Sequence, residues 1–196
     1  MEVLEAKSDR SRVTHEALLD AFVDLLGERP YAQIGVAQIA ARAGLTTGAI
    51  YSRFGSKQGV VLALHTRFVE HWISTMESWA AQPRWRSASS QEIISNWTRG
   101  AVNFSRIYRP LLDAVMQDPA MRDRYNESVG RASMILVHLL SDATPTDADD
   151  VINAINADDV AWAARAAVAI VERFDPSDST LESRIEDLIC RLTRVR

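Results

Sequence analysis

Residues 36–57 contain two short runs of apolar residues at helical spacing, separated by a glycine. In the first run Val36, Ile39 and Ala43 recur every three or four residues, which predicts a helix with one buried face. Gly44 follows directly, and a glycine ends a helix well because it adopts the left-handed conformation without steric cost. The second run is too short to form a stable helix without a neighbour. The spacing therefore predicts two packed helices joined by a tight turn.

The outer face of the second predicted helix carries small hydroxyl groups, a phenol and cations. Thr46 and Thr47 stand at its leading end, where they can contact base edges, and Gly48 lets the backbone approach DNA. Tyr51 and Lys57 are placed to reach phosphates. This combination is typical of a helix-turn-helix, whose second helix lies in the major groove. The predicted DNA-binding residues are Gln38, Thr46, Thr47, Gly48, Tyr51, Ser52, Arg53 and Lys57.

The same spacing also fits a helical hairpin that binds no DNA, because such motifs are weakly specific. The residues in addition resemble the N-terminal signature of the tetracycline-repressor (TetR-like) family of transcriptional regulators. The matching positions are Ile39-Ala40, Ala43-Gly44-Leu45, Gly48-Ala49-Ile50-Tyr51, Phe54 and Ser56-Lys57. The resemblance extends from Ala21 to about Trp72, so it covers the first third of the chain.

The chain departs from the family pattern in and beside the predicted helix pair. Gly35 stands where many relatives have a Ser or Thr helix cap, and Thr47 stands where a cation or proline is common. Ser52 replaces an aromatic residue or His, and Arg53 stands where a His is frequent. Arg53 can contact a phosphate or pair with an acidic neighbour, and the phosphate contact is preferred. These departures predict a base preference different from that of relatives.

Sparse glycine and proline and the lack of a strand pattern favour an all-α protein. Start and stop signals predict nine helices, of which the first runs from about residue 11 to 26. Together with the resemblance they predict a two-part chain. A three-helix helix-turn-helix domain covers residues 1–57, and a helical effector-binding and dimerisation domain covers residues 58–196.

Polar residues and prolines mark the starts of several later helices. Ser56 precedes Lys57 as a predicted N-cap, and Asp118 with Pro119 forms an N-cap followed by a first-turn proline. Pro110 is expected to open a short separate helix at its first turn. The last two helices are expected over about 146–174 and 179–195.

The chain carries a net charge of −4, which is unexpected for a DNA-binding protein. Residues 1–57 hold seven Lys and Arg against seven Asp and Glu, so the excess acid lies outside this segment. A neutral head predicts modest non-specific affinity and reliance on two heads acting together. A basic tip formed by Arg10, Arg12, Arg53 and Lys57 would suffice.

No signal-peptide pattern and no long apolar stretch occurs, so the sequence predicts a cytoplasmic protein without a membrane anchor. The single cysteine, Cys190, permits no internal disulfide. His65, His71 and His138 lack the spacing of metal ligands, and no cofactor motif occurs. The sequence therefore predicts neither a metal site nor a cofactor.

Apolar stripes on the last two predicted helices have two interpretations. They can cover the core of one subunit, or, as the resemblance implies, pair with their copies in a homodimer that binds a palindromic operator. The predicted interface residues are Trp162, Ala166, Ile170, Phe174, Ile185, Leu188 and Leu192.

The middle of the chain is rich in aromatic residues and methionines. Any single one of them is expected to be core, but as a group they can line an apolar cavity, where relatives hold a small effector. The predicted effector-binding residues are Trp97, Phe104, Tyr108, Trp162 and Met76, with Asn103 and His138 as polar contacts.

The resemblance implies a ligand-responsive transcriptional regulator, a repressor released by a small apolar or amphipathic effector. The helix that begins at Lys57 is expected to transmit the effect of the ligand to the DNA-binding head. No catalytic constellation is present, which argues against an enzyme. The remaining alternative is a helical protein-interaction module, or an activator, that has a helix-turn-helix head and no small-molecule effector.

Overall fold

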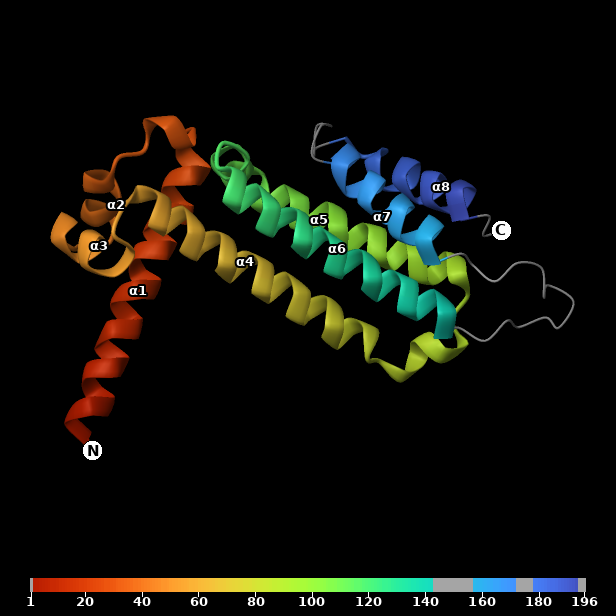
Figure 1. Cartoon of the computed structure of the whole chain (residues 1–196), viewed down its shortest axis with the longest axis horizontal. Helices are drawn as coiled ribbons and strands as arrows, with labels where there is room; N and C mark the ends of the chain where they lie inside the picture. Colours follow the sequence, from red (N-terminus) through yellow and green to blue (C-terminus); the bar gives the residue numbers. More distant parts are fainter. Residues whose placement is uncertain (1, 143–156, 172–177, 194–196) are drawn as a thin grey trace, which may run out of the picture. The chain divides into compact units, whose positions relative to one another are not determined.

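The computed structural model describes residues 2–142, 157–171 and 178–193, which contain helices and no strand (Figure 1). The chain divides into two compact units. The head unit comprises Met1–Phe68 and Pro110–Arg122, and the body unit comprises Val69–Arg109 and Asp123–Arg196. The compact units do not divide the chain at residue 57. The boundary predicted there, between a DNA-binding and an effector-binding domain, stays a prediction.

The head unit is built on three helices that pack around the start of a fourth. Figure 1 shows them gathered around the first turns of α4. Leu18, Phe22, Ile39, Ile50 and Leu64 have no exposed surface and form the centre of its core. The elements are α1 (Glu2–Glu28), the 3-10 helix η1 (Tyr31–Gln33), α2 (Val36–Arg42), α3 (Thr47–Phe54) and α4 (Lys57–Ala80).

The first helix is longer than the sequence predicted. α1 begins at Glu2 rather than near Ser11, so the predicted start is wrong. Residues 2–10 contain no glycine or proline, and nothing in them stops a helix from extending toward the N-terminus. Among the side chains of α1 whose burial the structure describes, Leu18 is the first that is fully buried.

The body unit contains most of α5 and α6 and the described parts of α7 and α8, while Pro110–Arg122 at the junction of α5 and α6 belong to the head unit. Trp97 Nε1 donates to the Ala132 carbonyl at 3.1 Å and so links α5 to α6. Arg106 Nη1 lies 3.3 Å from Glu182 Oε1 and links α5 to α8. α7 packs along α8 (Figure 1). The elements are η2 (Pro83–Ser87), α5 (Ser90–Met116), α6 (Pro119–Asp142), α7 (Ala157–Val171) and α8 (Leu181–Thr193).

The separate helix predicted at Pro110 does not form, because α5 continues through this residue to Met116. A proline inside a helix removes one backbone hydrogen bond and crowds the preceding turn. Pro110 is exposed, whereas Tyr108, Leu111 and Leu112 around it are buried. Burial of these neighbours holds the helix together across the proline.

The parts of the last two predicted helices that the structure describes are α7 and α8. Residues 143–156, 172–177 and 194–196 lie outside the described part of the chain, and Phe174 is among them. None of the described helices is both long and apolar enough to span a membrane.

Candidate nucleic-acid interface

The turn between α2 and α3 has the geometry that the sequence predicts. Gly44 has a φ of 67°, in the left-handed region that favours glycine. The Leu45 N–H donates to the Ala40 carbonyl at 2.8 Å, and the Gly44 N–H donates to the Ala41 carbonyl at 3.1 Å. These bonds satisfy carbonyls at the end of α2 and fix the direction in which the chain enters α3. The two helices form a helix-turn-helix, as predicted.

α3 presents one apolar residue to the core and a polar face to the outside. Ile50 is fully buried and anchors the helix in the head unit. Thr46, Thr47 and Ser52 are exposed, and Tyr51 has 57% of its surface exposed. An exposed phenol beside small hydroxyl groups can bond both phosphate and base-edge atoms. The structure therefore leaves these predicted DNA-binding residues accessible.

Gly48 lies in α3, and no contact with the described residues requires a glycine there. A Cβ atom at this position would meet only Thr46 Oγ1, at the ordinary contact distance of 3.7 Å. A glycine inside a helix costs about 0.5–1 kcal/mol relative to alanine. The contacts of the described residues thus give no reason for a glycine at this position, and its predicted role at the DNA stays a prediction.

The hydroxyl groups of α3 differ in their availability. Thr46 is the N-cap residue, yet its side chain makes no capping hydrogen bond. Ser52 Oγ donates to the Ala49 carbonyl of its own helix at 3.1 Å. A donor already bonded within the helix is less available to DNA, although the same oxygen can still accept. Thr46 is thus better prepared than Ser52 to donate to a base or phosphate.

Arg53 contacts α1 rather than an acidic neighbour. Its Nη1 atom donates to Ser11 Oγ at 2.9 Å, and the side chain is only partly exposed. Sequence reasoning did not find this contact, because Ser11 lies 42 residues earlier. The guanidinium has further N–H groups, so a phosphate contact stays compatible with this bond.

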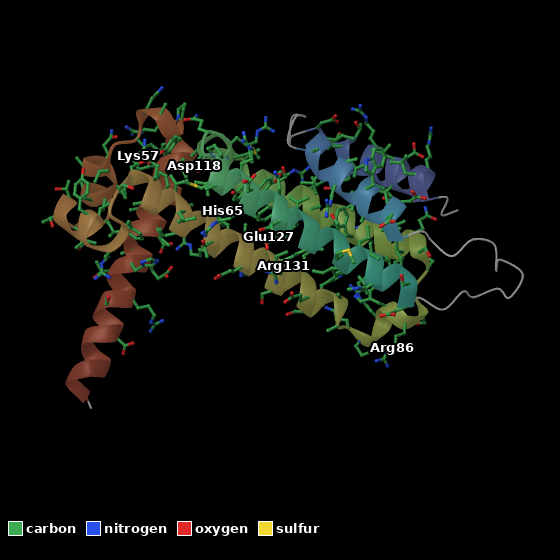
Figure 2. The ribbon with its side chains drawn as sticks, viewed as in Figure 1. Lys57, His65, Arg86, Asp118, Glu127 and Arg131 are labelled. Carbon is green, nitrogen blue, oxygen red and sulfur yellow. The ribbon has the colours of Figure 1, made fainter. Side chains whose placement is uncertain are left out.

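Lys57 lies at the start of α4, where Figure 2 labels it, and contacts Tyr31 in two ways. Its Nζ atom donates to the Tyr31 carbonyl at 2.9 Å and lies 3.7 Å from the centre of the Tyr31 ring. Burial lowers the pKa of the Lys57 ammonium and raises the pKa of the Tyr31 phenol. Ser56 Oγ accepts from the Gly59 N–H at 3.0 Å, which confirms Ser56 as the N-cap. The contact with η1 leaves two ammonium hydrogens for a phosphate.

On α2, Gln38 and Arg42 have partners within the head unit. The Gly35 N–H donates to Gln38 Oε1 at 2.7 Å, so this side chain supports the start of its own helix while Gln38 as a whole stays exposed. Arg42 Nη2 lies 2.7 Å and 2.9 Å from the two carboxylate oxygens of Glu28 on α1. Arg42 therefore fastens α2 to α1.

The Arg42–Glu28 contact predicts a specific pH dependence. The hydrogen bond from Arg42 lowers the pKa of the Glu28 carboxyl below 4.5. A carboxyl whose pKa is lowered on folding contributes stability above pH 4.5, and this contribution is lost as the pH falls through the folded-state value. Urea unfolding from about pH 7 to about pH 3 should therefore show a smaller acid-dependent loss of stability for Glu28→Gln than for the natural chain. Equal losses in the two proteins would contradict this role.

The residues predicted to bind an effector fall into two groups in the body unit. Trp162 is 62% exposed, and Asn103 and His138 are exposed as well. Asn103 Oδ1 accepts a hydrogen bond from Arg106 at 3.3 Å. The buried group consists of Trp97, Tyr108, Met76 and Phe104. Trp162 thus differs from the buried group in exposure, and the binding role of all seven residues stays a prediction.

One hollow, of about 290 Å³, lies in the head unit and contains none of these residues. Its only charged lining group, Asp118, already accepts from the N–H groups of Ala120 and Met121 at 2.9 Å and 3.3 Å. These bonds confirm Asp118 as the N-cap of α6. The lining residues are Tyr31, Gln58, Ala114, Gln117, Asp118, Pro119 and Met121.

The predicted dimer residues lie on α7 and α8 with different exposure. Trp162 is exposed, whereas Ile185 is only 2% exposed and packs inside its own chain. Ala166, Ile170, Leu188 and Leu192 are half-buried. These half-buried residues and Trp162 are the ones that a second subunit could still cover.

Comparison with known proteins finds a family match within the head unit. Residues 18–64 match the family of bacterial regulatory proteins described as the tetR family. No curated protein matches the sequence.

Several solved structures share the fold over most of the chain. A TetR-like transcriptional regulator from a Rhodococcus species is 20% identical, with 93% of this chain and 97% of that chain covered and a TM-score of 0.64. The TetR family regulator PfmR from Thermus thermophilus is 18% identical, with 90% and 97% covered and a TM-score of 0.61. The regulator FadR from Bacillus subtilis, in complex with stearoyl-CoA, is 17% identical, with 92% and 98% covered and a TM-score of 0.57. These likenesses confirm the predicted all-α, two-part fold with a helix-turn-helix head.

Proposed function

Because this chain carries the helix-turn-helix head of the tetR family, we propose that it is a ligand-responsive transcriptional repressor that binds a palindromic operator as a homodimer. The observation that carries the DNA-binding part is the outer face of α3. This face presents exposed Thr46, Thr47 and Tyr51 around Gly48, at which no contact with the part of the chain that the structure describes requires the absence of a side chain.

Each group on this face has a proposed role at the DNA. Thr46 and Thr47 contact base edges in the major groove, because they stand at the leading end of α3. Tyr51 and Arg53 reach phosphates beside them. Lys57 contacts a phosphate while it stays bonded to the Tyr31 carbonyl.

The Lys57 contact predicts a change in salt dependence. Each phosphate that a cation neutralises contributes about 0.9 to the slope of log affinity against log salt concentration. Lys57→Met should therefore lower this slope by about 1.8 in a dimer that uses both lysines. The measurement is fluorescence anisotropy of labelled operator at several salt concentrations. A weaker affinity with an unchanged slope would instead assign Lys57 to holding η1 on α4.

The proposed homodimer uses the outer faces of α7 and α8. Trp162 is 62% exposed on α7, and large exposed aromatic side chains are common anchors of protein interfaces. The two-fold symmetry of such a dimer would place two copies of α3 at equivalent positions on the two half-sites. The operator is therefore expected to be palindromic.

The proposed effector binds in the body unit and releases the DNA. α4 has residues in both compact units, so a displacement of its body-unit part can reach the head. The effector acts only if it binds the released conformation more tightly than the DNA-bound one. The stearoyl-CoA complex of FadR supports a small apolar or amphipathic molecule as the class of effector.

Selection of genomic fragments by the purified protein tests this function. The expected result is a short palindromic sequence on which the protein leaves a footprint with two-fold symmetry. A reporter gene placed behind this sequence should be silenced by the protein. Failure to enrich any sequence would refute operator binding. Enrichment of a single half-site by a monomer would refute the dimer.

A further inference from the structure

The indole N–H of Trp72 is buried in the body unit and donates to no acceptor in the described part of the chain. The Trp72 side chain is 6% exposed, and its ring lies parallel to Phe104 with a centroid distance of 4.1 Å. A buried donor without an acceptor is unfavourable, because it has lost its hydrogen bonds to water. A phenylalanine at this position would keep a ring against Phe104 and avoid that loss.

Other buried indoles of the body unit do have acceptors. Trp97 Nε1 donates to the Ala132 carbonyl at 3.1 Å, and Trp85 Nε1 donates to the Trp79 carbonyl at 2.6 Å. Both side chains are at least as buried as Trp72. The fold thus provides carbonyl partners for buried indoles of the same unit, and Trp72 differs from them.

The surroundings of Trp72 are aromatic. The stack continues from Phe104 to Tyr108, with centroids 5.1 Å apart, and from Tyr108 to Tyr125, with centroids 5.3 Å apart. Apolar walls with a small number of polar groups are the usual composition of small-molecule sites.

We propose that the Trp72 N–H donates a hydrogen bond to the effector, and that the effector is an amphipathic molecule with a neutral carbonyl or ether oxygen. This inference rests on the effector binding proposed above and specifies its chemistry. The Trp72 N–H has already lost its hydrogen bonds to water on folding, so the bond to the ligand forms without a further desolvation cost for this donor. A neutral acceptor is preferred because the ring stacked on Trp72, that of Phe104, is apolar and a buried charge is unfavourable.

The unpaired state of the donor can be tested without any ligand. Trp72→Phe removes the N–H and keeps an aromatic ring, and Trp85→Phe is the matched control because its N–H is bonded. Both substitutions shorten a buried ring and carry a cavity cost, but only Trp85→Phe also breaks a hydrogen bond, so the thermal unfolding midpoint of the full-length protein should be lower by about 2–4 °C for Trp85→Phe than for Trp72→Phe. An equal decrease in both variants would overturn the proposal, because the Trp72 N–H would then be bonded in the ligand-free protein.

The chemistry of the ligand can be tested with matched probes. The ketones 2-undecanone and 4-phenyl-2-butanone carry an acceptor, and undecane and butylbenzene lack one. In ¹H–¹⁵N spectra of the full-length protein, the indole signal that disappears in Trp72→Phe identifies Trp72. We expect at least one ketone to move this signal downfield. The same ketone should bind the natural chain more tightly than it binds Trp72→Phe, by about tenfold or more. Each hydrocarbon should bind the two proteins equally.

The proposal is overturned if neither ketone moves the Trp72 signal, or if Trp72→Phe binds the ketones as tightly as the natural chain. These measurements contain no DNA, so a failure of operator selection would refute the regulatory function and leave their result intact. Conversely, if ketones and hydrocarbons release the protein equally well from a palindromic operator, the regulatory function is supported and the role of Trp72 is refuted.

Discussion

Replacement of Gly59 by alanine is expected to disrupt the head unit and abolish DNA binding. A Cβ atom at Gly59 would lie 1.8 Å from the Phe54 carbonyl oxygen and 2.8 Å from its carbon. Both atoms belong to the backbone, so no side-chain rotation relieves the clash. The end of α3 and the first turn of α4 would have to separate, at a cost of about 3 kcal/mol or more.

Gly27→Ala is the matched control for this substitution. It also places a methyl group on a helix of the head unit, but nothing lies within 4 Å of the new Cβ atom. Urea unfolding followed by circular dichroism should show a large loss of stability for Gly59→Ala and none for Gly27→Ala. If Gly59→Ala were as stable as the natural chain, the close packing of α3 against α4 would be incorrect.

Gly48→Ala is expected to have opposite effects on stability and on DNA binding. Alanine is the better helix former, and the added Cβ would meet only Thr46 Oγ1 at 3.7 Å. The free energy of unfolding should therefore rise by about 0.5–1 kcal/mol. If α3 lies against the floor of the major groove, the same methyl group should weaken operator binding by about tenfold or more, which corresponds to about 1.4 kcal/mol.

Urea unfolding measures the free energy of unfolding of each variant. Fluorescence anisotropy with the selected operator measures its affinity for DNA. Gly27→Ala is again the control, since it should keep its affinity while it gains helix stability. Unchanged affinity of Gly48→Ala would mean that the backbone at Gly48 does not approach the DNA. The part of α3 that contacts base edges would then have to lie closer to Tyr51 than proposed.

Features that depend on neighbouring residues were predictable from the sequence. The left-handed turn at Gly44 and the N-caps at Ser56 and Asp118 were all predicted, and the structure confirms each of them. Each of these features is decided by backbone conformation and hydrogen bonds within a few residues. The apolar spacing that buries Ile39 and Ile50 is equally local.

Features that depend on contacts between distant residues were not predictable. Arg53 bonds Ser11 across 42 residues, Lys57 bonds the Tyr31 carbonyl across 26, and Arg42 bonds Glu28 across 14. The sequence predicted a separate helix at Pro110, but burial of Tyr108 and Leu111 carries α5 through the proline. The proline signal is local, whereas the packing that overrides it is tertiary.

The amino-acid sequence by itself determined the helix pair of residues 36–57 and the residue types on its outer face, because periodicity and glycine conformation act locally. Only the tertiary structure decided how those residues are used. It bonds Lys57 to Tyr31, leaves Gly48 without a contact that requires it, and buries the Trp72 N–H without an acceptor among the residues it describes. Availability for a ligand depends on which groups the rest of the fold has already bonded, and that is set by contacts between residues far apart in the chain.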